Sequence, residues 1–149
     1  SEKQTALDKA LTHITASMKT ERDIRDFLKR KGYLQDVSDY VVEKMNGYGF
    51  LDDALYARQY AESASKTKGA RLIEAELRRK GISEEIASEA VGALQNGGES
   101  AKRVLVKYLR GKETGRDVLR KAFSYLISKG FDYDTAREAL GSLREEDED

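Results

Sequence analysis

The sequence predicts an all-α fold in which three tandem three-helix repeats, about nine helices in all, form an elongated curved array. Three observations support this prediction. A Lys-Gly pair recurs every 49 residues, at Lys31-Gly32, Lys80-Gly81 and Lys129-Gly130. Apolar residues fall at helical spacing around each pair. The chain has no Pro, and no run of alternating β-branched residues indicates a strand.

The three copies align without gaps over most of the chain. An arginine precedes each repeated glycine by ten residues, at Arg22, Arg71 and Arg120. The alignment predicts first helices over about 2–16, 52–65 and 100–111, second helices over 21–31, 70–80 and 116–129, and third helices over 35–46, 84–95 and 133–143. The repeats are then residues 1–49, 50–98 and 99–144, followed by an acidic tail at 145–149.

Local signals at the helix ends agree with these bounds. Each glycine suits the C′ position, where a left-handed conformation ends a helix, and the preceding Lys complements the helix dipole. Ser83 and Asp132 are expected N-caps, and Thr20 with Asp23 resembles a capping box. Leu34 stands at the equivalent place in the first repeat, so the side-chain cap is expected to be missing or displaced there.

The apolar stripes predict how the core is built. Ile24, Phe27 and Leu28 share one face of their helix, and the other helices show similar one-sided stripes. Short amphipathic helices of one unit are not expected to bury all of these stripes alone. We therefore expect neighbouring repeats to stack and complete one another's cores.

Composition excludes several classes of protein. There is no Cys and a single His, which excludes disulfide frameworks and the usual zinc sites. No apolar run approaches the ~18 residues that a membrane span needs, and the N-terminus lacks a secretory pattern. We expect a cytoplasmic, monomeric protein with no cofactor, no metal and no membrane association.

Few residues suggest chemistry. Asp52-Asp53 could supply acid–base groups or metal ligands, but capping by Asp52 and a first-turn place for Asp53 are favoured. His13 is expected to be half-buried rather than a ligand. Tyr56 and Tyr60, at helical spacing, favour packing over base stacking, and Gly97-Gly98 is expected in a turn. No nucleophile–base pair is visible, so no catalytic residue is predicted and the protein is not expected to be an enzyme.

The charges are balanced in number but unevenly placed. The chain has 27 basic and 27 acidic residues, yet residues 22–31, 66–80 and 102–121 carry net charges of +3, +4 and +6. These bases could form a strip that attracts phosphates or an acidic protein groove. The alternative is a set of solvated helix faces with pairs such as Asp26–Arg30. The candidate partner-binding residues are Arg22, Arg30, Lys31, Lys66, Lys68, Arg71, Arg78, Arg79, Lys80, Lys107, Arg110, Arg116 and Arg120.

The middle of the chain carries the most specific motifs. Gly49-Phe50-Leu51-Asp52-Asp53 is followed by Tyr56-Ala57, by Lys68-Gly69-Ala70 and by Leu77-Arg78-Arg79-Lys80-Gly81-Ile82-Ser83. This order resembles the RecX family of bacterial regulators of the RecA recombinase, over about residues 19–143. Ala70 departs from the pattern, because the family often has Pro there, but Ala also fits the first turn of a helix.

The resemblance implies a non-enzymatic modulator of RecA. Such a protein would bind the RecA–single-stranded DNA filament and inhibit its ATPase, strand exchange and co-protease activity, and so regulate recombination and the SOS response. Two alternatives stay open: a helical-repeat module that binds single-stranded or duplex DNA independently of RecA, and a helical adaptor for another protein.

Overall fold

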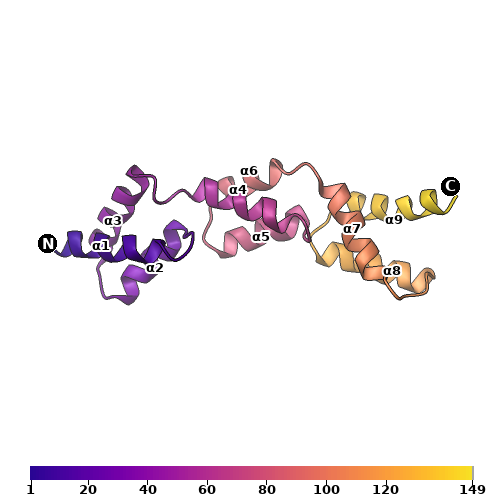
Figure 1. The fold of residues 1–149 in the computed structure, drawn as a ribbon, viewed down its shortest axis with the longest axis horizontal. Coiled ribbons are helices and arrows are strands. Elements are labelled where there is room, and N and C mark those ends of the chain that lie inside the picture. The colour runs from indigo at the N-terminus through magenta and orange to yellow at the C-terminus, as the bar shows by residue number, and fades with distance from the viewer. Residues whose placement is uncertain (149) are drawn as a thin grey trace.

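A computed structural model describes residues 1–148 and, up to residue 144, their side chains. This part of the chain consists of helices joined by short turns, with no strand. The helices are α1 (Glu2–Ile14), α2 (Glu21–Arg30), α3 (Gln35–Gly47), α4 (Asp53–Ala64), α5 (Ala70–Arg79), α6 (Glu84–Gly92), α7 (Gly97–Leu109), α8 (Arg116–Ser128) and α9 (Tyr133–Glu148). They form an elongated array with the two termini at opposite ends (Figure 1). None of these helices is both long and apolar enough to cross a bilayer.

The predicted helices are confirmed with small shifts at their ends. Gly97-Gly98 was expected in a turn, but Gly97 begins α7 and both glycines lie in its first turn. The last helix runs beyond residue 143 to Glu148. The predicted acidic tail therefore begins as a helix, although the side chains of residues 145–148 and all of Asp149 lie outside the described part.

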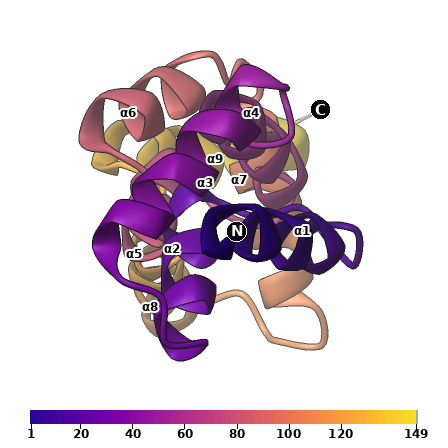
Figure 2. The same cartoon turned by 90° about the vertical axis from the view of Figure 1, so that its left-hand side faces the viewer.

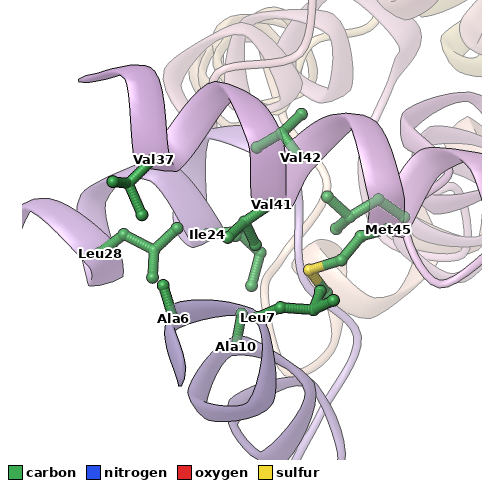
Figure 3. Close-up of a cluster of buried hydrophobic side chains, with 10 residues drawn as sticks. Ala6, Leu7, Ala10, Ile24, Leu28, Val37, Val41, Val42 and Met45 are labelled. Carbon is green, nitrogen blue, oxygen red and sulfur yellow. The ribbon is translucent and has the colours of Figure 1, made fainter. Parts of the chain in front are cut away.

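The helices of each repeat enclose a separate hydrophobic core, so the expectation that neighbouring repeats stack to complete one another's cores is wrong, although Leu51 from the start of the second repeat joins the core of the first. The extensive helix–helix contacts all fall within a repeat: α1, α2 and α3 pack together, as do α4–α6 and α7–α9. In the first repeat, Ile24 and Leu28 of α2 are fully buried against α1 and α3 (Figure 3). Ala6 and Ala10 of α1 are fully buried, and their small side chains let α1 pack closely on α2 and α3. Three short helices can therefore bury the apolar stripe of α2 within one repeat.

The three Lys-Gly pairs end the middle helices in the same way. Gly32, Gly81 and Gly130 have φ angles of +90°, +92° and +95°. Residues other than glycine rarely adopt such backbone angles. The next residue then donates its N–H to a carbonyl five residues back, as from Ile82 to Leu77 at 3.1 Å, and turns its side chain into the core. This is the Schellman geometry, and it confirms the predicted glycine C-caps.

The predicted N-caps are also confirmed. The Thr20 hydroxyl accepts from the Asp23 N–H at 3.1 Å, and the Asp23 carboxylate accepts from the Thr20 N–H at 3.0 Å. Ser83 accepts from the N–H of Ile86. Asp132 accepts from the N–H of Thr135 at 2.8 Å. Leu34 provides no side-chain cap to α3, as expected.

The repeats are joined where their middle helices meet end to end. At the first junction, the C-terminal turn of α5 contacts the N-terminus of α2, and the Arg22 guanidinium donates to the Arg79 carbonyl at 2.5 Å. At the second junction, the C-terminal turn of α8 contacts the N-terminus of α5, and the Gly69 N–H donates to the Lys129 carbonyl at 2.8 Å. Both contacts pair the positive end of one helix dipole with the negative end of another.

These junctions place α2, α5 and α8 along one side of the molecule. They follow one another along the lower edge in Figure 1, and Figure 2, which looks along the array, shows them one behind the other on the same side. The 49-residue period thus becomes a column of middle helices, flanked by the first and third helices of each repeat.

Candidate functional site

The column of middle helices collects most of the predicted partner-binding bases. We call these residues the basic column: Arg22, Arg30 and Lys31 from α2 and its C-terminal turn, Arg71, Arg78, Arg79 and Lys80 from α5 and its turn, and Arg116 and Arg120 from α8. The other four candidates lie beside it. Lys66 and Lys68 are in the turn between α4 and α5, Lys107 is on α7, and Arg110 follows α7.

Most of these charges face solvent. All thirteen candidates are exposed except Lys68 and Lys80, which are half-buried. Among the side chains described, only Lys68 and Arg120 of the thirteen form an ion pair, the latter with Asp117 at 3.5 Å on a highly exposed surface. The Asp26–Arg30 pair, given above as an example of the alternative, is not formed within that part of the chain. The ion pairs of α2 instead use Arg25, with Glu21 at 3.4 Å and Asp39 at 2.7 Å.

Arg22 has a structural contact that the sequence did not suggest. Its guanidinium donates to the Arg79 carbonyl, and its aliphatic part lies against Gly81, where a Cβ would come within 2.6 Å of the Arg22 Cδ. Arg71, the equivalent residue in the second repeat, uses its backbone instead, donating its N–H to the Gly130 carbonyl at 3.1 Å. One candidate side chain is therefore engaged in holding two repeats together.

Lys68 is the candidate least available to a partner. Its ammonium lies 2.8 Å from one carboxylate oxygen of Glu76 and 3.0 Å from the other, and the Tyr60 hydroxyl donates to Glu76 at 2.8 Å. Burial alone would raise the pKa of Glu76, but the hydrogen bonds from Lys68 and Tyr60 outweigh it and lower that pKa. Burial, together with the bond to Glu76, raises the pKa of Tyr60 to about 12. This cluster stabilises the second repeat from within.

The tyrosine pair of the second repeat packs as the sequence favoured. The rings of Tyr56 and Tyr60 are stacked with centroids 6.5 Å apart, and both contact the core of that repeat. Neither ring is a free platform for a nucleic-acid base.

His13 marks a second group of bases at the C-terminal ends of α1 and α2. Its ring stacks on Phe27 at 4.1 Å and is half-buried, as expected. Burial lowers the pKa of His13, and the positive charges of Lys19, Arg30 and Lys31 lower it further. Lys19 is missing from the predicted set. Its equivalence to Lys68, 49 residues later, was a signal that could have included it.

Asp52 and Asp53 both accept hydrogen bonds from backbone N–H groups. Asp52 caps α4 by accepting from the Leu55 N–H at 3.0 Å, which confirms the favoured interpretation. Asp53 lies in the first turn and also accepts from the N–H of Glu21 at 3.0 Å, across the first junction. Burial raises the pKa of Asp53. Within the described residues, no three histidine or carboxylate side chains gather where they could hold a metal ion.

Comparison with known families agrees with this three-part architecture. The family model for the RecX first three-helix domain matches residues 6–45, the model for the second matches 52–91, and the model for the third matches 99–140. The chain belongs to the RecX family. Each match falls within one structural repeat.

The relatives of this chain are regulatory proteins by name. The Regulatory protein RecX of Prosthecochloris aestuarii is 29% identical over 147 residues, covering 96% of both chains. That of Clostridium perfringens strain 13 is 32% identical over 140 residues, covering 90% of this chain and 66% of the relative. The chain spans only 65% of the length of the Clostridium botulinum Eklund 17B relative, at 30% identity.

Solved RecX structures share the fold. The crystal structure of RecX from Lactobacillus salivarius superposes with a TM-score of 0.89 at 22% identity, covering 96% of this chain and 97% of that one. A second crystal structure of a regulatory protein RecX gives 0.85 at 26% identity, covering 93% and 72%. The tandem arrangement of three-helix repeats is thus common to these proteins.

Proposed function

We propose that this chain is a non-enzymatic cytoplasmic regulator that binds the RecA–single-stranded DNA filament and inhibits its ATPase, strand exchange and co-protease activity. Two findings support the proposal: membership of the RecX family, and a column of exposed bases that repeats along the molecule. The column is the observation that carries it. Among the described side chains, Arg120 alone of the column forms an ion pair, so the column stays available to an anionic surface.

The shape suits a filamentous target. A filament repeats its surface along its axis, and an array with several basic sites can contact more than one protomer, so weak contacts add through effective concentration. Charge complementarity would also steer the encounter. Inhibition follows if the chain binds an inactive or disassembling filament state more tightly than the active one.

The test is the single-stranded-DNA-dependent ATPase of RecA with and without this chain. We expect the chain to slow hydrolysis at micromolar concentration, and the double variant Arg78→Glu/Arg79→Glu to be about tenfold less potent, since each reversal removes roughly 0.5–1 kcal/mol of charge attraction. Arg58→Glu/Lys102→Glu makes the same change in net charge at exposed positions outside the column. This control should retain inhibition, and circular dichroism should show equal helicity in all three proteins.

The main alternative is binding to nucleic acid without RecA. Exposed bases along one side of a helical array favour phosphate contacts as well, and the affinity of the chain alone for single-stranded or duplex DNA would then fall steeply with salt. Salt-dependent DNA binding together with an unchanged RecA ATPase would replace the proposed function. Absence of both effects would favour an adaptor for another protein.

A further inference from the structure

The third repeat contains an open groove that lies away from both junctions and shares Arg120 with the basic column. It lies between α8 and α9 and has a volume of about 550 Å³. Its apolar lining comes from Leu119 and Phe123 of α8 and from Leu140 and Leu143 of α9, all half-buried. Three arginines also line it: Arg120, Arg137 and Arg144.

The first repeat has a different set of side chains at this place. Alignment by the repeat period pairs Leu119, Phe123, Arg137 and Arg144 with Glu21, Arg25, Asp39 and Asn46 of the first repeat. Those four side chains satisfy one another, because Arg25 pairs with Glu21 and Asp39, and the Asn46 amide donates to Glu21 at 3.5 Å. The third repeat therefore has an apolar floor in place of this polar network, and among the described side chains Arg137 and Arg144 form no ion pair.

The first repeat also shows what docks beside that network. Leu51, at the start of the second repeat, is only 3% exposed and packs in the first core with Val42 and Met45. Those two residues are equivalent to Leu140 and Leu143 of the groove. Asp53, two residues after Leu51, accepts the hydrogen bond from the N-terminus of α2. In the first repeat, the segment that docks on this face is thus a leucine followed by carboxylates.

We propose that the α8–α9 groove docks an acidic segment of a partner protein that carries one or more large apolar side chains. The apolar floor would bury the leucine-type side chain, and the arginines would pair with the flanking carboxylates. Arg137 lies over the exposed Tyr133 ring at 6.0 Å, and the one ion pair of Arg120 among the described side chains is its exposed contact with Asp117. Both guanidinium groups can therefore turn to a ligand without breaking a buried interaction.

Other occupants fit less well. Residues 145–149 supply acids but no apolar side chain to fill the floor. A second copy of this chain would offer Glu2 and Gln4 at the places equivalent to Leu51 and Asp53, so its first repeat lacks the leucine. The inference does not rest on RecA, because the assay below contains none.

The experiment measures binding of a labelled helical peptide of about twelve residues, with leucines on one face and Glu and Asp on the other, to the whole chain. The control peptide has Lys in place of the acids. We expect the acidic peptide to bind with a dissociation constant on the order of tens of micromolar, more tightly at low salt, and the basic peptide not to bind.

Two variants make the result specific to the groove. Arg137→Glu/Arg144→Glu, at exposed positions, should weaken binding about tenfold or more, whereas Arg58→Glu/Lys102→Glu should leave it unchanged. Phe123→Ala should weaken binding at any salt concentration by removing apolar floor. Equal binding of both peptides, or no effect of the reversal at positions 137 and 144, would overturn the proposal. Self-association of the chain that this reversal abolishes would assign the groove to a second copy instead.

Discussion

The two junctions between repeats join equivalent elements with different chemistry. At the first junction the contacts come from side chains: the Arg22 guanidinium reaches the Arg79 carbonyl, and the Thr20 hydroxyl lies 3.4 Å from the Lys80 carbonyl. At the second junction they come from the backbone, since the N–H groups of Gly69 and Arg71 donate to the C-terminal turn of α8.

The residue at the N-cap of the middle helix accounts for the difference between the two junctions. Thr20 and Gly69 are equivalent N-cap positions, 49 residues apart. The side chain of Thr20 caps its own helix and keeps the neighbouring turn at a distance. Gly69 has no side chain, so the backbone of Gly130 approaches it so closely that a Cβ on either glycine would clash. Backbone hydrogen bonds leave little freedom at the second junction, whereas the side chains at the first junction can change rotamer. We therefore expect less relative motion between the second and third repeats than between the first and second.

The largest predicted effect is at the second junction. Gly130→Ala should destabilise the protein by about 3 kcal/mol, because it forces a side chain into a left-handed conformation and into the Leu72 Cβ, 2.5 Å away. Gly32→Ala has the same φ strain but no atom within 4 Å, so it should cost only about 1 kcal/mol. Thermal unfolding measures the loss of stability in both variants, and hydrogen exchange of the Arg71 amide reports whether the second junction opens.

A second pair of variants checks that the clash, rather than the strain, opens the junction. Gly69→Ala has no unfavourable φ but meets the backbone of Gly130, so it should also expose the Arg71 N–H to exchange. Gly115→Ala, at another helix N-cap with open space around it, should not. If Gly32→Ala and Gly130→Ala were equally destabilising, the close approach at the second junction would be contradicted.

Much of the fold could be predicted because the information is local. The Lys-Gly period, the glycine C-caps and the Thr20 capping box are all read within a few residues of the helix ends they determine. The junctions could not be predicted in this way. Alignment of Gly69 with Thr20 shows that the positions are equivalent, but not that each contacts the glycine turn of the next repeat. The separate cores were missed because amphipathic stripes do not reveal how closely alanine-lined helices approach.

The candidate site was predictable only as a set of charges. The sequence identified the bases, but their availability depends on contacts across the structure, and these engage Lys68 with Glu76 and Arg22 with Arg79. The groove of the third repeat was missed for another reason. Its residues differ from those at the equivalent positions of the other repeats. An alignment that looks for shared residues therefore does not identify Arg137 and Arg144. Comparing the copies for their differences would have found them.

A smaller effect is predicted at the first junction. Arg22→Ala removes a hydrogen bond from a charged group to a helix carbonyl and should destabilise the protein by about 1 kcal/mol, which lowers the melting temperature by roughly 2–4 °C for a chain of this size. Arg71→Ala keeps the backbone N–H that serves the second junction, so it should lower the melting temperature by less. Equal shifts for the two variants would contradict the division into a side-chain junction and a backbone junction.

The smallest effect distinguishes the junctions by pH. Asp53 accepts from the Glu21 N–H at the first junction, whereas the equivalent residue at the second is Lys102. Because burial raises the pKa of Asp53 above its ordinary value of 3.8, the folded protein holds this proton more tightly than the unfolded chain does. The contribution of Asp53 to stability is therefore largest below that ordinary value and falls as the pH rises through the raised pKa.

Asp53→Asn keeps an oxygen acceptor for the Glu21 N–H but removes this titration. The free energies of unfolding of the two proteins should therefore differ by a few tenths of a kcal/mol, shifting in favour of the variant as the pH rises from about 3 to 6. Glu76 and Asp132, whose pKa values are lowered, change stability in the opposite direction, but they do so equally in both proteins and cancel in the difference. Denaturant titrations of both proteins across this pH range measure the difference in free energy of unfolding. If that difference does not change with pH, the Asp53 carboxylate is as well solvated at the first junction as it is in the unfolded chain.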